Sequence, residues 1–206
     1  MLQNIEANRK NGLFWILIIA AATVLVWLAP EEKQLGQGIK SVYVHVALIW
    51  VGMAGLVAAG LIGIGVLLSA SRKLSAWMET VGWVALGFYA AGVSMSVLAS
   101  KVNWGNVFWQ EPRMKVALNM LALALIVEIF VSWVPWHRLK GFLSSLLVVI
   151  LAWTTMSAPL VLHPKNAISS SSSSGIKMTF LGLSLLIAAA AAWIVWFVKS
   201  KRALTD

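Results

Sequence analysis

Six long runs of apolar residues, separated by short polar segments, divide the chain. They cover approximately Leu13–Ala29, Val42–Ser69, Ala76–Ala99, Met114–Trp133, Leu139–Leu162 and Ile176–Val198. About 20 apolar residues in a helix span the hydrocarbon core of a bilayer. The strict alternation that a transmembrane barrel needs is absent, and isolated strands cannot satisfy their backbone in lipid. The pattern predicts an all-α polytopic membrane protein: one domain over residues 1–206, with six transmembrane helices.

Composition supports a bilayer as the environment of this chain. Of 206 residues, 60% are hydrophobic and only 11% are charged, whereas a soluble domain is typically about half apolar and a quarter charged. The net charge of +9 lies in short clusters between the apolar runs, which is typical of membrane helix flanks, so we expect no nucleic-acid partner. The chain has no Cys, which excludes disulfides and thiolate chemistry of its own. No small-residue cleavage site follows the first run, which predicts a retained helix.

Lys and Arg set the predicted orientation. With a cytoplasmic N-terminus, the inner segments carry nine basic residues and the outer segments carry seven. The inner set is Arg9, Lys10, Arg72, Lys73, Arg138, Lys140, Lys199, Lys201 and Arg202; the outer set is Lys33, Lys40, Lys101, Arg113, Lys115, Lys165 and Lys177. The small inner excess favours both termini cytoplasmic, in a protein that we expect in the cytoplasmic (inner) membrane.

The three histidines fall on two different faces in this arrangement. His45 lies near the first end of the second run and His163 at the far end of the fifth. Six alternating spans bring both to the outer face, whereas His137 falls on the inner one. Haem iron accepts neutral imidazole as an axial ligand, and b-type sites between helices commonly use two. The alternative is that each His is an interfacial polar residue satisfied by backbone or water.

The segment Lys101–Arg113 is predicted to lie on the same outer face as that histidine pair. Its aromatic residues are close enough together to form an apolar surface on which a porphyrin could rest, while Gly105 would permit close backbone approach. Arg113 could pair with a haem propionate, because guanidinium matches carboxylate geometry. The aromatic residues are Trp104, Phe108 and Trp109. The alternative is an interfacial aromatic belt, since the chain contains 12 Trp and Trp is enriched at membrane interfaces.

Two acidic residues, Glu79 and Glu128, fall within apolar runs, where a carboxylate is costly. Glu79 is near Arg72–Lys73, so a salt bridge at the helix end or solvation is favoured over a proton relay. Glu128 is deeper and could be protonated or paired within the bundle. Neither is included in the predicted site.

Signatures of common enzymes are missing from the sequence. There is no Gly-rich nucleotide-binding loop ending in Lys, no His-Glu-x-x-His motif and no Gly-x-Ser-x-Gly elbow. These absences favour a protein that binds or carries a ligand without a catalytic motif of its own.

Three segments resemble, in order, those of the haem-handling cytochrome c assembly family. They are Val42–Tyr43–Val44–His45–Val46; then Trp104–Gly105, Phe108 and Glu111–Pro112–Arg113; and finally Leu162–His163. The second is similar to the Trp-rich signature known as the WWD domain, and the likeness is greatest to the haem exporter protein C (CcmC) type. That signature usually ends in Trp-Asp, where this chain has Gln110–Glu111. The resemblance is therefore to a divergent member.

This resemblance implies transient, non-covalent binding of haem b at the outer face. His45 and His163 would be the axial iron ligands. The rest of the site would come from the segment Lys101–Arg113, which we call the aromatic loop. The remaining cofactor-binding residues would be Trp104, Gly105, Phe108, Trp109, Glu111 and Arg113. The partners implied are haem, a haem chaperone of the CcmE type or a ligation complex, and ABC transporter subunits.

Two alternatives remain at this stage. One is a membrane b-type electron-transfer cytochrome that uses the same two histidines, and the other is a haem-free permease or structural subunit. Placement of both histidines near predicted helix ends, beside the aromatic loop, favours haem delivery during cytochrome c maturation over a buried cytochrome site.

Overall fold

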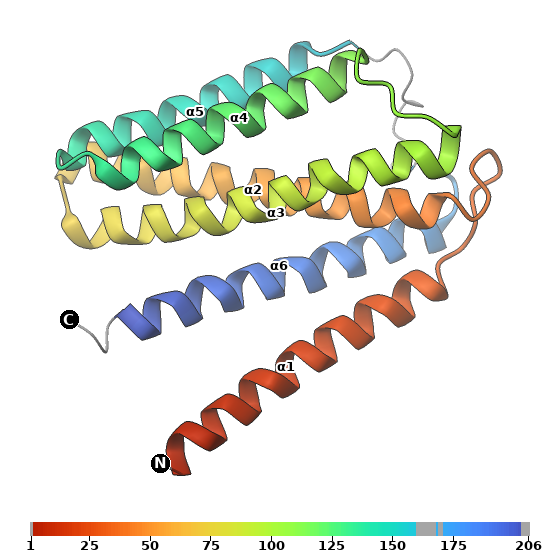
Figure 1. Ribbon diagram of the computed structural model, residues 1–206, viewed down its shortest axis with the longest axis horizontal. Helices are drawn as coiled ribbons and strands as arrows, with labels where there is room; N and C mark the ends of the chain where they lie inside the picture. The colour runs from red at the N-terminus through yellow and green to blue at the C-terminus, as the bar shows by residue number, and fades with distance from the viewer. Residues whose placement is uncertain (1, 160–167, 169–170, 203–206) are drawn as a thin grey trace.

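The computed structural model describes residues 2–159, 168 and 171–202, and it is built from six helices. Successive helices run in opposite directions along the long axis (Figure 1). Their bounds are α1 (Leu2–Trp27), α2 (Ile39–Ser69), α3 (Arg72–Trp104), α4 (Pro112–Trp133), α5 (His137–Ser157) and α6 (Ser174–Arg202). The all-α prediction is confirmed.

Five of these helices, α2 to α6, are long and apolar enough to cross a membrane. Within α1, the apolar stretch Asn11–Trp27 is shorter than the other five, so a sixth span stays a prediction. Large apolar side chains on the outside of the helices are exposed, including Trp153 at 73% and Met156 at 86%. Such extensive apolar exposure is unfavourable in water but fits helices that face lipid.

The observed helix ends follow local capping chemistry. The α3 helix extends past its apolar run because the Ser71 side chain caps it by accepting from the Leu74 amide. The α5 helix is shorter than predicted. It ends at Ser157, and Ala158 turns to an extended conformation with ψ 120°, because the following Pro159 disfavours helical geometry in the residue before it. The helix therefore ends before the predicted position, and the last predicted residue, Leu162, lies outside the described residues.

The α2 helix packs against α3 and α5 through backbone-to-backbone approach at glycines. A Cβ on Gly52 would lie 2.5 Å from the Tyr89 amide nitrogen, and one on Gly63 would lie 2.9 Å from the Gly141 carbonyl oxygen. Small residues allow this close packing between membrane helices, where burial from water contributes little. The Ser145 hydroxyl also donates to the Gly60 carbonyl across α2 and α5 at 3.0 Å.

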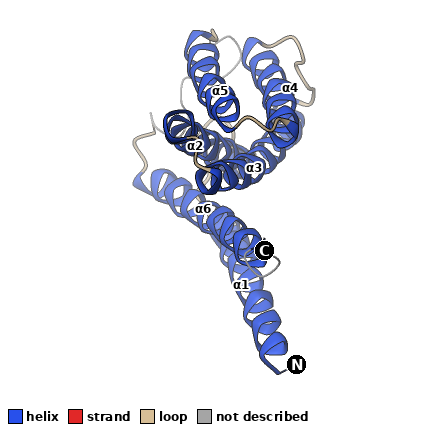
Figure 2. Ribbon diagram, turned by 90° about the vertical axis from the view of Figure 1, so that its left-hand side faces the viewer, coloured by secondary structure: helices blue, strands red, loops and turns tan. Residues whose placement is uncertain are grey.

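The α1 and α6 helices lie to one side of the group formed by α2 to α5 (Figure 2). Phe14 of α1 stacks on Trp193 of α6 with ring centroids 4.2 Å apart. The α6 helix in turn contacts α2 and α3. This pair therefore joins the bundle mainly through α6.

Alternation of the helices sorts the connections onto two ends (Figure 1). We call the end that contains Ile39, Trp104 and Pro112 the loop end, and the end that contains the α2–α3 and α4–α5 turns the terminal end. The N-terminus of α1 and the C-terminus of α6 both point toward the terminal end. The membrane side of each end stays a prediction.

Candidate functional site

His45 lies at the loop end, on α2, six residues after Ile39. Its imidazole is half-buried, and Nδ1 lies 2.9 Å from the Gly92 carbonyl oxygen of α3. A carbonyl oxygen only accepts, so this contact requires the proton on Nδ1. Metal ligation by this imidazole would therefore use Nε2, with the ring orientation set by a backbone group, as is usual for metal-binding histidines.

Asn103 ties the end of α3 to the start of α2. Its Nδ2 donates to the Gly38 carbonyl at 3.2 Å, to the Ser41 hydroxyl at 3.1 Å and to the Ala99 carbonyl at 2.8 Å. The Asn103 Oδ1 is buried and has no hydrogen-bond partner among the described residues. Sequence analysis missed this residue, because its partners on α2 lie more than 60 positions away and carry no motif.

Gly105 ends α3 and lies within the aromatic loop. Its φ is +71°, in the left-handed region, and its amide donates to the Lys101 carbonyl at 3.0 Å. Glycine adopts this conformation without the penalty that a Cβ brings. A Cβ here would meet nothing within 4 Å. Glycine is therefore favoured at this position by its backbone conformation and not by a lack of space.

The loop exposes its aromatic side chains at the surface of the loop end. The exposed fractions are 40% for Trp104, 39% for Phe108 and 52% for Trp109. Amphipathic Trp side chains at such a position suit either a flat ligand or the interfacial region of a bilayer. The haem platform and the interfacial aromatic belt therefore both stay predictions.

Glu111, Pro112 and Arg113 start α4. The Glu111 side chain is the N-cap, since its Oε2 accepts from the Met114 amide at 2.8 Å, and Pro112 occupies the first turn. Both choices are favourable at a helix start. Glu111 is only 5% exposed, so its described contact orients the loop and α4. Direct binding of a ligand by Glu111 stays a prediction.

Arg113 follows within the first turn of α4 and is half-buried. Its Nε is buried without a hydrogen-bond partner, and no ion pair to its guanidinium occurs in the described part of the chain. The N-terminus of a helix adds partial positive charge. Arg113 and the start of α4 together form an electropositive position that suits a carboxylate.

The histidine and the loop share one end of the bundle but differ in depth. Gly92, which contacts His45, lies twelve residues before Trp104 on α3, which is roughly 18 Å along the axis at 1.5 Å per residue. His163 is six residues beyond the end of α5 and lies outside the described residues. His137 starts α5 at the terminal end, away from His45.

The described residues contain three features that suit haem. They are an imidazole of defined tautomer, an exposed aromatic loop, and a cation whose buried Nε lacks a partner. A cluster of three or more His, Cys, Asp or Glu side chains able to hold a metal ion is absent from these residues.

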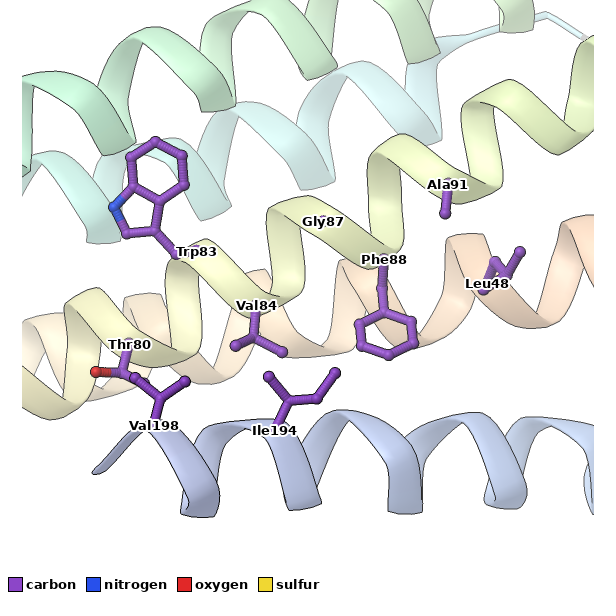
Figure 3. A pocket seen from close by; sticks show the side chains of 9 residues that line it. All are labelled: Leu48, Thr80, Trp83, Val84, Gly87, Phe88, Ala91, Ile194 and Val198. Carbon is purple, nitrogen blue, oxygen red and sulfur yellow. The ribbon is translucent and has the colours of Figure 1, made fainter. Parts of the chain in front are cut away.

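A groove between α3 and α6 is a poor candidate for the same site. It has a volume of about 520 Å³, and side chains such as Phe88 and Ile194 line it (Figure 3). The lining residues include Thr80 and Trp83 but no His, Lys, Arg or carboxylate. It can hold an apolar chain but offers nothing that would ligate iron or pair with a propionate.

No family model matches the sequence. A liverwort protein from Marchantia polymorpha, described as a cytochrome c biosynthesis ccmC-like mitochondrial protein, is 22% identical over 114 residues. The match covers 55% of this chain and spans about half the length of that relative. This similarity agrees with the resemblance found in the sequence, but it covers too little of either chain to establish membership of the family.

Proposed function

We propose that this chain binds haem b at the loop end and presents it to a partner during cytochrome c maturation. The observation that carries the proposal is the arrangement of His45 and Arg113. The imidazole of His45 is oriented by the Gly92 carbonyl, and the guanidinium of Arg113, at the same end, has a buried Nε without a partner in the described residues. The partial similarity to a ccmC-like protein supports the same role.

The residues would divide the work of holding haem. His45 would ligate iron through Nε2 on one side of the ring, and His163 would be the second ligand. Arg113 would pair with a propionate. The aromatic loop would contact the porphyrin face. The two neutral imidazoles would hold the haem through its iron, without a covalent bond to the porphyrin.

Partial exposure of the aromatic loop fits delivery better than storage. A carrier must release its ligand, so weak enclosure lowers the barrier to transfer, and an exposed ring edge allows an acceptor to reach it. The proposed acceptor is a haem chaperone of the CcmE type or a ligation complex, with ABC transporter subunits supplying energy. The chain itself would act without a catalytic step.

A membrane electron-transfer cytochrome is the second candidate, and one observation favours it. His45 lies roughly 9 Å along α2 from the helix start at 1.5 Å per residue, inside the bundle and below the loop. Cytochromes hold haem between helices and keep it through many redox cycles. The two functions therefore differ in whether bound haem leaves the protein.

Transfer of haem between purified proteins tests the proposal. The full-length chain is loaded with haem in a detergent micelle and mixed with an apo-chaperone of the CcmE type, and haem in each protein is measured after separation. Delivery predicts movement of haem to the chaperone. Retention of all haem, together with reversible reduction and oxidation of the iron, would instead establish the cytochrome.

A second acceptor provides the control for this experiment. Apomyoglobin takes any haem that dissociates into solution, so it measures simple release. Directed delivery predicts faster transfer to the chaperone than to apomyoglobin at equal concentration. Equal rates to both acceptors would show dissociation without delivery and would contradict the proposal.

A further inference from the structure

A buried ion pair lies at the terminal end, where α3, α4 and α5 meet. Lys140 Nζ lies 2.6 Å from Glu79 Oε1, and the Ser75 hydroxyl donates to the same oxygen at 3.2 Å. Lys140 is only 8% exposed. The partner of Glu79 is therefore a lysine 61 positions away, not the Arg72–Lys73 pair that sequence analysis favoured. The pair neutralises one carboxylate and one ammonium group.

A second carboxylate lies beside this pair without a cation of its own. Glu128 of α4 is 2% exposed, and its side chain lies against Gly82 of α3. A Cβ on Gly82 would be 2.7 Å from Glu128 Oε2. Gly82 is three residues after Glu79, so the two positions lie on the same face of α3. The Glu128 carboxylate takes part in none of the side-chain hydrogen bonds and ion pairs found within residues 11–159.

Within residues 11–159, the charged groups around this position offer no counter-ion to Glu128. The helices packed against α4 are α3 and α5. On α3, Glu79 is committed to the ion pair, two exposed basic residues lie at the helix start, and the exposed Lys101 lies in the last turn at the opposite end. On α5, Lys140 is already paired, while the half-buried His137 and the exposed Arg138 occupy the first turn. The exposed basic residues at the start of α3 are Arg72 and Lys73.

An ionised carboxylate that is buried without a cation or a hydrogen-bond donor is strongly unfavourable, and such a group takes up a proton instead. The negative charge of Glu79 adds repulsion to this cost, because like charges disfavour each other's ionised form. One bound proton on Glu128 leaves the buried group of three side chains with no net charge.

We infer that Glu128 is an intramembrane proton-binding site, separate from the haem site, that holds a proton at neutral pH beside the ionised Glu79–Lys140 pair. The proton comes from water and adds to one carboxylate oxygen, giving a neutral carboxylic acid. Glu79 is 21% exposed and lies one turn nearer the terminal end of α3 than Gly82, which contacts Glu128. It is the group through which a proton would exchange with that end.

Infrared spectroscopy of the full-length protein tests this protonation state directly. The difference spectrum of wild type minus Glu128→Gln at neutral pH should contain the carbonyl stretching band of a protonated carboxylic acid. Glu79→Gln, the matched change on α3, should remove carboxylate bands instead. Carboxylate bands in the Glu128→Gln difference at neutral pH would overturn the inference.

Chemical labelling provides an independent measurement of the same site. Dicyclohexylcarbodiimide dissolves in the bilayer and reacts with protonated carboxylic acids, and the product is located by peptide mass spectrometry. Glu128 should be labelled at neutral pH and Glu79 should not. In Lys140→Met, Glu79 loses its cation and should become labelled as well. Labelling of Glu79 in preference to Glu128 in the wild type would contradict the inference.

Discussion

Replacement of Gly92 by alanine should destabilise the protein by a calculable amount. A Cβ on Gly92 would lie 2.8 Å from the backbone nitrogen of Ile49 and 2.8 Å from its Cγ1. A backbone atom at that distance cannot rotate away, so α2 and α3 must separate. Overpacking of this kind costs about 1–3 kcal/mol. Alanine is also a better helix former than glycine by about 1 kcal/mol, which offsets part of that cost.

Gly87→Ala is the matched control on the same helix. A Cβ at Gly87 would meet nothing within 4 Å, because this glycine faces the groove between α3 and α6. The gain in helix propensity is common to both variants and cancels in their difference. The free energy of unfolding of Gly92→Ala should therefore be lower than that of Gly87→Ala by about 1–3 kcal/mol.

Denaturant unfolding in detergent micelles, followed by far-UV circular dichroism, measures this difference. The same variant should also perturb haem, because the Gly92 carbonyl that orients His45 moves with α3. A displaced Soret band in Gly92→Ala and an unchanged band in Gly87→Ala are expected. Equal unfolding free energies in the two variants would refute the close approach of α2 and α3 at this position.

Three further changes test separate contacts. Asn103→Leu removes the hydrogen bonds from Nδ2 that link α3 to the start of α2. Each bond contributes about 0.5–1.5 kcal/mol, so the melting temperature should fall. An unchanged melting temperature would show that the link does not stabilise the fold. Glu111→Ala should lower the free energy of unfolding by about 0.5–2 kcal/mol through loss of the cap, and Glu111→Asp should restore most of it; failure of Asp to restore it would exclude capping as the cause. Arg113→Ala should weaken haem affinity by up to about fivefold, because an ion pair with some exposure typically contributes about 0.2–1 kcal/mol; an affinity equal to wild type in a haem titration would exclude propionate pairing.

Much of the fold follows from patterns local in the sequence. The apolar runs predicted the order of helices and the alternation that brings His45 to the end opposite His137. The end of α5 was also encoded locally, in Pro159, but the apolar residues beyond it led to a helix prediction that was too long. An apolar run shows that a segment can lie in lipid, but it does not show where the helix ends. Here the helix ends before Pro159, because proline disfavours helical geometry in the residue before it.

Contacts between distant positions were beyond sequence analysis. Lys140 pairs with Glu79 across 61 positions, and Gly92 binds His45 across 47. Neither pair has a spacing or motif that distinguishes it from other polar or small residues in apolar runs. Helix rotation and crossing decide which of them meet, and these depend on small-residue packing along the whole interface. The role of Glu111 could not be predicted either, because a glutamate can cap a helix or bind a ligand and the sequence does not distinguish the two.

The absorption spectrum of the purified full-length protein tests haem binding most directly. Wild type should show a Soret band after loading with haem, and the band should weaken in His45→Ala and in His163→Ala. His137→Ala is the matched control, because it removes an imidazole at the terminal end, and it should leave the band intact. A spectrum lost in His137→Ala but retained in His45→Ala and His163→Ala would contradict a haem site at the loop end.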